Sequence, residues 1–418
     1  MLASGFPIYV VLLGTASVTL VLFTDVPVIA LHQSLFGAVE SFALLAIPFF
    51  IFAGELMARA SIAKRIVALV DEGTGPVRGK IGYTTIATTT LFGAISGSAP
   101  ATVATVGRLM LPTLRGSNYP DHVSAGLLTS AGTIGVLIPP SIPLIVYGVA
   151  ANESVPRLFA AGILPGLVVA VMMAALVAVQ TRVYGISDGR RFESKNFFQA
   201  ATKGAFALLP AAIILGGIYG GVFSPTEAAG VACIASIAVG WLIYRDLTSY
   251  DIMKCAERTA FLTAQLMIIV AAAGVFSWVL TINQIPQNVA DWLVSADLSL
   301  FVLLLLVNLA LLVLGAFLDP IAAILIVTPL LAPVLAAAGV DLVHLGIIMT
   351  LNLAIGLLTP PFGLSLFVAQ GALDMPMRVI LRGVLPVLLV QLSALAIVTY
   401  LPELSTALPS FLFANPNN

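Results

Sequence analysis

The sequence predicts an all-α polytopic membrane protein of two inverted repeats, each containing a re-entrant helical hairpin and a broken helix. Three observations predict this fold class. First, 60% of the 418 residues are hydrophobic and 9% are charged, which leaves too little polar surface to cover a soluble domain. Second, a double proline interrupts an apolar run at two places. Third, matching landmarks recur at a nearly constant spacing in the two halves of the chain.

The two interruptions share one motif. Gly135–Pro140 and Gly356–Pro361 each place three residues between a glycine and a pair of prolines. Proline has no backbone N–H, so the carbonyls of both glycines, and of Val136 and Leu357, lose their helical donors. Such oxygens are costly inside a bilayer unless they are satisfied. The motif therefore predicts a bound cation, water or a neighbouring polar side chain at each break.

The elements of the first half follow from hydropathy and charge. Apolar stretches at 6–24 and 42–58 are long enough to cross a bilayer, which takes about 20 residues. Residues 59–80 carry five Lys or Arg and predict an amphipathic helix on the cytoplasmic surface. Residues 81–114 are basic at both ends and interrupted by Gly and Ser in the middle, which favours a hairpin open to that surface. A broken helix is predicted at 122–151.

The second half repeats this pattern in the opposite orientation. The later elements are spans at 158–181, 205–222, 227–244 and 383–401, a hairpin at 300–336 and a broken helix at 344–370. Four landmarks, Gly54, Gly93, Gly135 and Ile163–Pro165, recur as Gly274, Gly315, Gly356 and Val384–Pro386. The segment 283–300, which matches 59–80, has two Asp and no Lys or Arg. Opposite charge at matching positions predicts inverted repeats, whose interface holds the substrate and ion sites of many secondary transporters.

Five motifs resemble the large membrane (M, DctM-type) subunit of tripartite ATP-independent periplasmic (TRAP) transporters. They are Gly93–Thr102, Gly135–Ser141, Pro225–Ala229, Asp319–Pro320 and Gly356–Gly363. The resemblance covers nearly the whole chain and implies a sodium-coupled elevator transporter. It also implies import of organic acids such as C4-dicarboxylates or sialic acid, delivered by a periplasmic substrate-binding protein. A small four-helix membrane subunit would be a second, separate partner.

The resemblance also implies a location and a division of labour. The chain would lie in a bacterial inner membrane, and the charge pattern places its N-terminus in the cytoplasm and its C-terminus in the periplasm. Scaffold segments are predicted at 1–80, 158–299 and 375–418. Transport-domain segments, each holding a hairpin and a broken helix, are predicted at 81–157 and 300–374.

Two sodium sites are predicted at the breaks, because a hard monovalent cation needs several oxygen ligands and unwound backbone supplies them. The first site would use Gly93, Ser96, Gly135, Ile138 and Pro139. The second would use Gly315, Gly356, Thr359 and Phe362, with the Thr359 hydroxyl as an added ligand. The family's sodium sites, carried onto matching positions, fall in the same places, although Gly93 stands where other members have a serine. The alternative is that these glycines and prolines only bend and pack helices.

Substrate contacts are predicted at the first hairpin tip and in the second hairpin. Ser96, Ser98 and Thr102 carry hydroxyls suited to a carboxylate, with tight packing of small residues as the alternative. Asp319 is costly in an apolar hairpin and would act near the ion or substrate, or cap the helix that begins at Pro320. Two cysteines and three scattered histidines show no transition-metal spacing, so Na⁺ is the predicted metal.

Other functions are compared on the same residues. An intramembrane enzyme would need paired acids, a Ser/His pair or a metal cluster at membrane depth, and the only strong intramembrane acid is Asp319. The chain has no phosphate-binding loop for ATP-driven pumping, and its net charge of −1 argues against a nucleic-acid partner. A stand-alone sodium- or proton-coupled dicarboxylate or citrate carrier remains the closest competitor.

Overall fold

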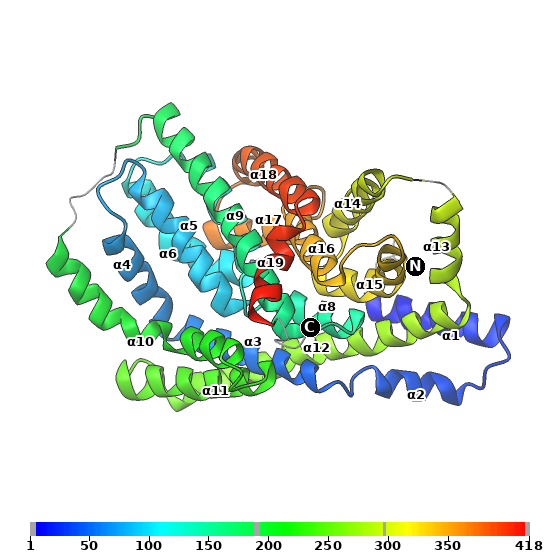
Figure 1. The fold of residues 1–418 in the computed structure, drawn as a ribbon. Coiled ribbons are helices and arrows are strands. Elements are labelled where there is room, and N and C mark those ends of the chain that lie inside the picture. Colours follow the sequence, from blue (N-terminus) through cyan, green and yellow to red (C-terminus); the bar gives the residue numbers. More distant parts are fainter. Residues whose placement is uncertain (1–5, 188–192, 296–297, 414–418) are drawn as a thin grey trace.

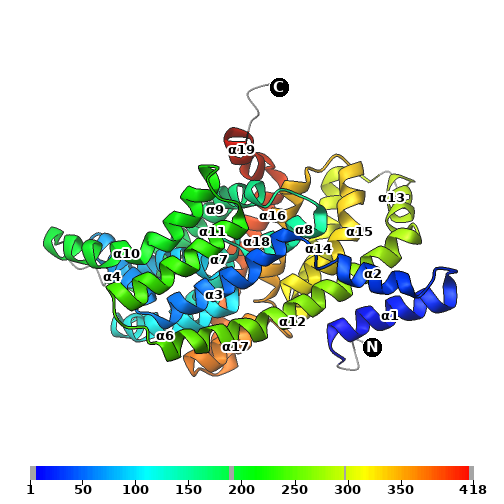
Figure 2. The same cartoon turned by 90° about the horizontal axis from the view of Figure 1, so that it is seen from below.

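The computed structural model describes residues 6–187, 193–295 and 298–413, and within these ranges all regular elements are helices. Eight of the described helices are long and apolar enough to cross a membrane, or nine if one bent pair counts as a single span. The prediction of an all-helical, multi-span membrane protein is therefore confirmed. Figures 1 and 2 show the helices as a peripheral group around a central group.

The peripheral group comes from the first 73 residues and from the middle of the chain. Its members are α1 Ile8–Phe23, α2 Ile29–Gly37, η2 Phe42–Leu45, α3 Ala46–Arg59, α4 Ile62–Gly73, α10 Ser194–Tyr219, α11 Pro225–Ile237, η3 Ala238–Ile243, α12 Ser249–Ile282 and α13 Ile285–Ser295. Both α1 and α2 pack against α12, α3 packs against α11 and α12, and α4 packs against α10. The long helix α12 thus runs alongside α1, α2 and α3 (Figure 2).

The central group contains the segments that the sequence predicts as hairpins and broken helices. Its members are α5 Lys80–Ser96, α6 Ala99–Gly116, α7 Asp121–Leu137, α8 Ile142–Ala151, α9 Val155–Val183, α14 Leu300–Phe317, α15 Pro320–Ala337, α16 Leu342–Gly356, α17 Leu364–Leu373, α18 Met377–Tyr400 and α19 Glu403–Leu412. The helices α7 and α8 are bent by 42° at their break. Both predicted double-proline motifs interrupt helices in the structure, and both Pro–Pro peptide bonds are cis.

The packing of the central group is reciprocal. The first hairpin helix α5 packs on α7, and its counterpart α14 packs on α16. The second hairpin helix of each half then reaches the other half, because α6 packs on α17 and α15 packs on α8. Helices α9 and α18 also lie within this group: α18 packs closely on α7, and α9 contacts α7, α16 and α18. The two halves therefore interlock around α7 and α16.

Three helical features are not predicted by the sequence analysis. These are α2, α19 and the full length of α12, which is one helix of 34 residues. The start of α12 is fixed by a capping box, in which Thr248 Oγ1 accepts the Asp251 N–H and the Asp251 carboxylate accepts the Thr248 N–H. This cap lets the helix begin among charged residues before its apolar run.

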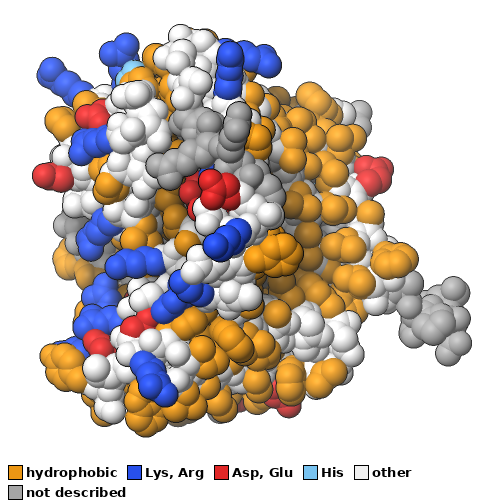
Figure 3. Space-filling view, turned by 90° about the vertical axis from the view of Figure 1, so that its left-hand side faces the viewer, with side chains coloured by type: hydrophobic (Ala, Val, Ile, Leu, Met, Phe, Trp, Pro, Cys, Tyr) orange, Lys and Arg blue, Asp and Glu red, His pale blue; other side chains and the backbone are white. Residues whose placement is uncertain are grey.

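The side of the molecule that carries α4 and α10 is rich in basic side chains beside broad hydrophobic surfaces (Figure 3). Polar contacts join the ends of the peripheral helices here. Arg59 pairs with Asp251 at 2.8 Å, and the Arg65 guanidinium lies 3.7 Å from the Asp246 carboxylate and 3.6 Å above the Tyr244 ring. The predicted amphipathic segment at 59–80 contains α4, whose buried residues are Ile62, Ala63 and Ile66.

Candidate functional site

In the first half, the hairpin touches the broken helix through two glycines. A Cβ atom built on Gly93 of α5 would overlap the Cα of Gly135 of α7, and the reverse holds for Gly135. A side chain at either position would therefore force the two backbones apart. The hairpin turn also meets the break, since a Cβ on Gly97 would lie 3.0 Å from the Pro140 carbonyl oxygen. The predicted residues Gly93 and Gly135 are thus brought together.

The first break supplies carbonyl oxygens as predicted. After α7 ends at Leu137, Ile138 is extended with φ −81° and ψ 126°, as expected for a residue before proline. Within the described ranges, no N–H or side-chain donor hydrogen-bonds to the carbonyls of Gly135 or Val136. The chain becomes helical again at Ile142, where Ser141 Oγ accepts the Leu144 N–H at 3.4 Å.

The second half repeats the glycine contact. A Cβ on Gly356 of α16 would lie 2.5 Å from the Cα of Gly315 of α14. The helix α14 ends at Phe317, and the Phe317 ring packs 5.5 Å, centroid to centroid, from that of Phe362 beyond the second break. Two pairs of glycines that are far apart in sequence therefore form equivalent contacts between a hairpin and a broken helix.

The second break differs from the first in its hydrogen bonding. The Gly356 carbonyl accepts the Thr359 N–H at 2.9 Å, and the Leu357 carbonyl accepts the Ser365 N–H at 3.2 Å. Both carbonyls have lost their helical donors, as predicted, but each accepts another backbone N–H: that of Thr359, just before the prolines, and that of Ser365, beyond them. Thr359 Oγ1 donates to the Ile355 carbonyl at 3.1 Å. A carbonyl or hydroxyl oxygen retains a second lone pair after one such bond.

The hairpin glycines differ between the two halves in the opposite sense to the glycines at the breaks. At the second hairpin, no donor in the described ranges hydrogen-bonds to the Gly315 carbonyl. At the first hairpin, the Gly93 carbonyl accepts the Gly97 N–H at 2.8 Å. Each glycine pair therefore has one carbonyl without a hydrogen-bond donor among the described residues: that of Gly135 in the first pair and that of Gly315 in the second.

The first hairpin tip buries most of its hydroxyls. Ser96 and Thr102 are buried, and Thr102 Oγ1 donates to the Ser98 carbonyl at 2.9 Å. Ser98 is the N-cap residue of α6 without a side-chain capping bond. The Thr102 proton is therefore used within the hairpin, whereas Ser98 lies half-buried at the start of a helix.

Asp319 is an N-cap, which is one of the two roles predicted for it. Its carboxylate accepts the Ile321 N–H at 3.0 Å at the start of α15, and Pro320 is the first residue of that helix. The capping bond fixes the turn between α14 and α15. It places a carboxylate at the tip of the second hairpin, opposite in chemistry to the hydroxyls of the first.

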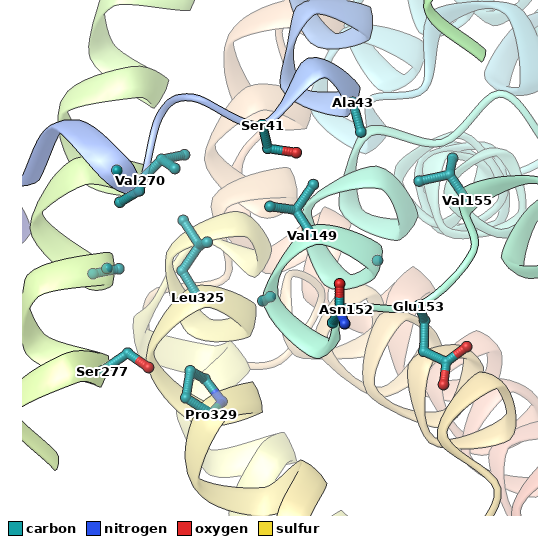
Figure 4. Close-up of a pocket in the computed structure, with 16 residues that line it drawn as sticks. Ser41, Ala43, Val149, Asn152, Glu153, Val155, Val270, Ser277, Leu325 and Pro329 are labelled. Atoms are coloured by element: carbon teal, nitrogen blue, oxygen red, sulfur yellow. The ribbon is translucent and has the colours of Figure 1, made fainter. Parts of the chain in front are cut away.

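A cavity of about 490 Å³ is lined by residues of both the peripheral and the central group. Figure 4 shows Ser41 and Ser277 on the peripheral side, and Val149, Asn152 and Leu325 on α8, its end and α15. None of the predicted ion or substrate residues lines this cavity. Its walls belong to both groups, so a change in their relative position would change its shape.

Three buried carboxamides near the breaks were not predicted from the sequence. Gln391 of α18, Asn308 of α14 and Asn352 of α16 are buried and hydrogen-bonded between helices. Amide side chains inside apolar spans are a usable signal, because burying them is costly without partners.

Within the described residues, eight or nine candidate spans include interrupted helices that meet neighbouring helices at glycines, an arrangement typical of polytopic helical membrane transporters. Residues 1–404 match the family described as the tripartite ATP-independent periplasmic transporter, DctM component. The chain belongs to this family of large TRAP permease components, and it is a transporter component rather than an enzyme.

Two relatives are similar in sequence over nearly the whole of this chain. The C4-dicarboxylate TRAP transporter large permease protein DctM of Pseudomonas aeruginosa is 41% identical over 398 residues, covering 95% of this chain and 93% of that protein. The isethionate TRAP transporter permease protein DctMQ of Oleidesulfovibrio alaskensis is 38% identical over 411 residues, which are 98% of this chain and 64% of that protein.

A solved structure shares the fold. The Alcanivorax borkumensis YdaH transporter superposes with a TM-score of 0.67, covering 95% of this chain and 97% of that one, at 15% sequence identity. Similarity at this identity concerns the arrangement of the helices alone.

Proposed function

We propose that this chain is the large permease subunit of a sodium-coupled importer of organic acids. The observation that carries the proposal is the pair of glycine contacts, Gly93 with Gly135 and Gly315 with Gly356, each beside a helix break. Both contacts bring the backbone of a predicted hairpin close to that of a predicted broken helix, beside main-chain oxygens that the breaks leave without helical donors. Such oxygens are suitable ligands for a dehydrated monovalent cation.

The proposed first sodium ion is held by oxygens of Gly93, Ser96, Gly135, Ile138 and Pro139. The proposed second ion is held by Gly315, Gly356, Thr359 and Phe362. The strongest candidates are the carbonyls that no donor in the described part of the chain satisfies, namely those of Ser96, Gly135, Ile138, Pro139, Gly315 and Phe362. The others contribute through their second lone pairs.

The substrate and partners are proposed from the relatives. One relative is named for C4-dicarboxylates and one for isethionate, both of them organic acids. The DctMQ relative is longer than this chain, which covers 64% of it; we infer that its extra part corresponds to the small membrane subunit. Here that subunit and a periplasmic substrate-binding protein would be separate chains, and Ser98, Thr102 and Asp319 near the hairpin tips are the proposed substrate contacts.

The proposed mechanism is an elevator, in which the central group moves against the peripheral group. The segments 81–157 and 300–374 belong to the moving unit. Packing favours adding α9 and α18, which the sequence analysis assigns to the scaffold at 158–299 and 375–418, because both lie against α7. The remaining helices of the peripheral group would form the stationary scaffold.

Inverted repeats set the proposed topology. They are supported by reciprocal packing of α6 on α17 and of α15 on α8. We propose an inner-membrane location with a cytoplasmic N-terminus and a periplasmic C-terminus. Single cysteines at the exposed positions Lys64 and Asn288, in a variant without Cys233 and Cys255, should react with a membrane-impermeant maleimide from opposite faces of the membrane. Labelling from the same face would contradict the inverted topology.

Uptake by the reconstituted transporter tests the function. Vesicles containing this chain and its small subunit should import a C4-dicarboxylate only when the binding protein and an inward sodium gradient are both present. Uptake driven equally by a proton or potassium gradient would refute sodium coupling. Uptake of free substrate without the binding protein would instead favour a stand-alone carrier.

A further inference from the structure

Each interrupted helix is contacted, within five residues before its contact glycine, by a buried carboxamide hydrogen bond. In the first half, Gln391 of α18 reaches α7. Its Nε2 lies 2.6 Å from Thr133 Oγ1 and 3.4 Å from the Ser130 carbonyl oxygen. Gln391, Ser130 and Thr133 are all fully buried, and Thr133 precedes Gly135 by two residues.

This hydrogen bond lies next to the end of α7, where backbone hydrogen bonds are missing. The last turn of α7 lacks the N–H groups that Pro139 and Pro140 would have supplied. A side-chain donor from a neighbouring helix therefore fixes that turn laterally. The position of the Gly135 carbonyl depends on the same turn.

In the second half, an asparagine pair occupies the corresponding place. Asn352 Nδ2 of α16 donates to Asn308 Oδ1 at 2.7 Å and to the Asn308 carbonyl at 3.0 Å. Asn308 Nδ2 in turn donates to Thr399 Oγ1 of α18 at 3.2 Å. Asn352 lies four residues before Gly356, and Asn308 lies seven before Gly315, so both point along the faces that carry the glycine contact.

Helix α18 is common to both arrangements, since Gln391 reaches α7 and Thr399 reaches α14. Burying the Gln391 and Asn352 carboxamides also costs free energy that an apolar side chain of similar size would not. Gln391 Oε1 and Asn352 Oδ1 are buried and have no hydrogen-bond partner in the described part of the chain, and a buried acceptor without a donor is destabilising. Leucine or methionine would fill these positions without that cost.

We propose that Gln391 and the Asn308–Asn352 pair are positioning residues for the two ion sites. Gln391 holds the first site through the last turn of α7, and Asn352 holds the second through the α14–α16 contact. They keep the glycine carbonyls at the separation that a cation requires before it binds, and preorganised ligands bind more tightly than mobile ones. This proposal rests on the proposed sodium coupling.

Thermal unfolding of the purified full-length permease with increasing sodium chloride tests it, with choline chloride keeping ionic strength constant. A ligand that binds only the folded state stabilises it by an amount that grows with the logarithm of one plus the ratio of ligand concentration to Kd, so weaker binding requires more ligand for the same rise in melting temperature. Gln391→Met and Asn352→Leu should each increase the sodium concentration needed for a given rise in melting temperature by up to about fivefold, the effect of one net hydrogen bond. Ser236→Ala removes a buried hydrogen bond in the peripheral helix α11 and should leave that concentration unchanged.

Pairs of substitutions assign each residue to its site. Asn352→Leu should add little to the effect of Thr359→Val, because both act on the second site, whereas Gln391→Met should add its full effect. Lower melting temperatures in choline with an unchanged sodium dependence would show a purely structural role and overturn the proposal. A parent protein that sodium does not stabilise would refute the sodium sites themselves, and this inference would fall with them.

Discussion

At the scale of single residues, the contact glycines matter for what they lack. Gly93, Gly135, Gly315 and Gly356 allow backbones to approach where a Cβ would meet another main chain rather than a flexible side chain. Backbone in the middle of two packed helices cannot shift without moving the whole hairpin. The requirement for glycine at these places is therefore steric, whether or not an ion is bound.

Alanine at a contact glycine should separate the hairpin from its broken helix. We expect Gly135→Ala to lower the free energy of unfolding by about 1–3 kcal/mol, the usual cost of overpacking, and to abolish uptake. Gly230→Ala is the matched control, because Gly230 lies within α11 and a Cβ there would meet nothing within 4 Å. Thermal unfolding and uptake should be measured on both. Equal effects of the two substitutions would contradict the steric role.

Thr359 offers a separate test of the second ion site. Its hydroxyl donates to the Ile355 carbonyl at 3.1 Å, which leaves oxygen lone pairs available to a cation. Thr359→Val preserves the shape of the side chain and removes its oxygen. The sodium concentration for half-maximal uptake should therefore increase, by up to about tenfold. Thr359→Ser should restore it. A valine variant with the sodium dependence of the parent protein would exclude this ligand.

At the scale of elements, helix ends decide how the two halves interlock. Asp341 caps α16 by accepting the N–H groups of Val343 and His344. The Tyr147 hydroxyl of α8 donates to the Leu342 carbonyl at 2.6 Å, so the end of the first broken helix is tied to the start of the second. Gly346 makes room for the Tyr147 ring, which a Cβ there would meet at 2.5 Å.

Removing the tyrosine hydroxyl should weaken this link between the halves. Tyr147 is fully buried, and its ring would stay in place in Tyr147→Phe. We therefore expect a loss of about 1 kcal/mol in the free energy of unfolding, the usual net value of one hydrogen bond. Chemical unfolding of the two proteins provides the comparison, with Tyr250→Phe as a control in an exposed position. A stability equal to that of the parent protein would show that the link contributes nothing.

At the scale of the whole molecule, the cavity between the peripheral and central groups reports their relative motion. Ser277 of α12 and Val149 of α8 line it from opposite groups, whereas Ser277 and Ser41 line it from the same group. A flexible bifunctional maleimide joining cysteines at Ser277 and Val149 should stop uptake, because it ties the moving unit to the scaffold. The same reagent joining Ser277 and Ser41 should permit it. Undiminished uptake after the first cross-link forms would exclude an elevator motion across this cavity.

The sequence by itself determined the all-helical, multi-span membrane class and the two points at which double prolines interrupt helices. Their signals are local: hydropathy over about 20 residues marks a span, and a double proline removes helical donors wherever it falls. The pairing of Gly93 with Gly135 could also be anticipated, because the motifs recur at matching positions in both halves.

Only the tertiary structure decided which oxygens are satisfied and which helices pack on the site. The Leu357 carbonyl, expected to lack a helical donor, is paired with the N–H of Ser365 beyond the second break. Likewise, Gln391 lies more than 250 residues from Thr133 in sequence and yet bonds to it. Such partners arise from chain reversal and from contacts between distant helices, and hydropathy and proline patterns describe neither.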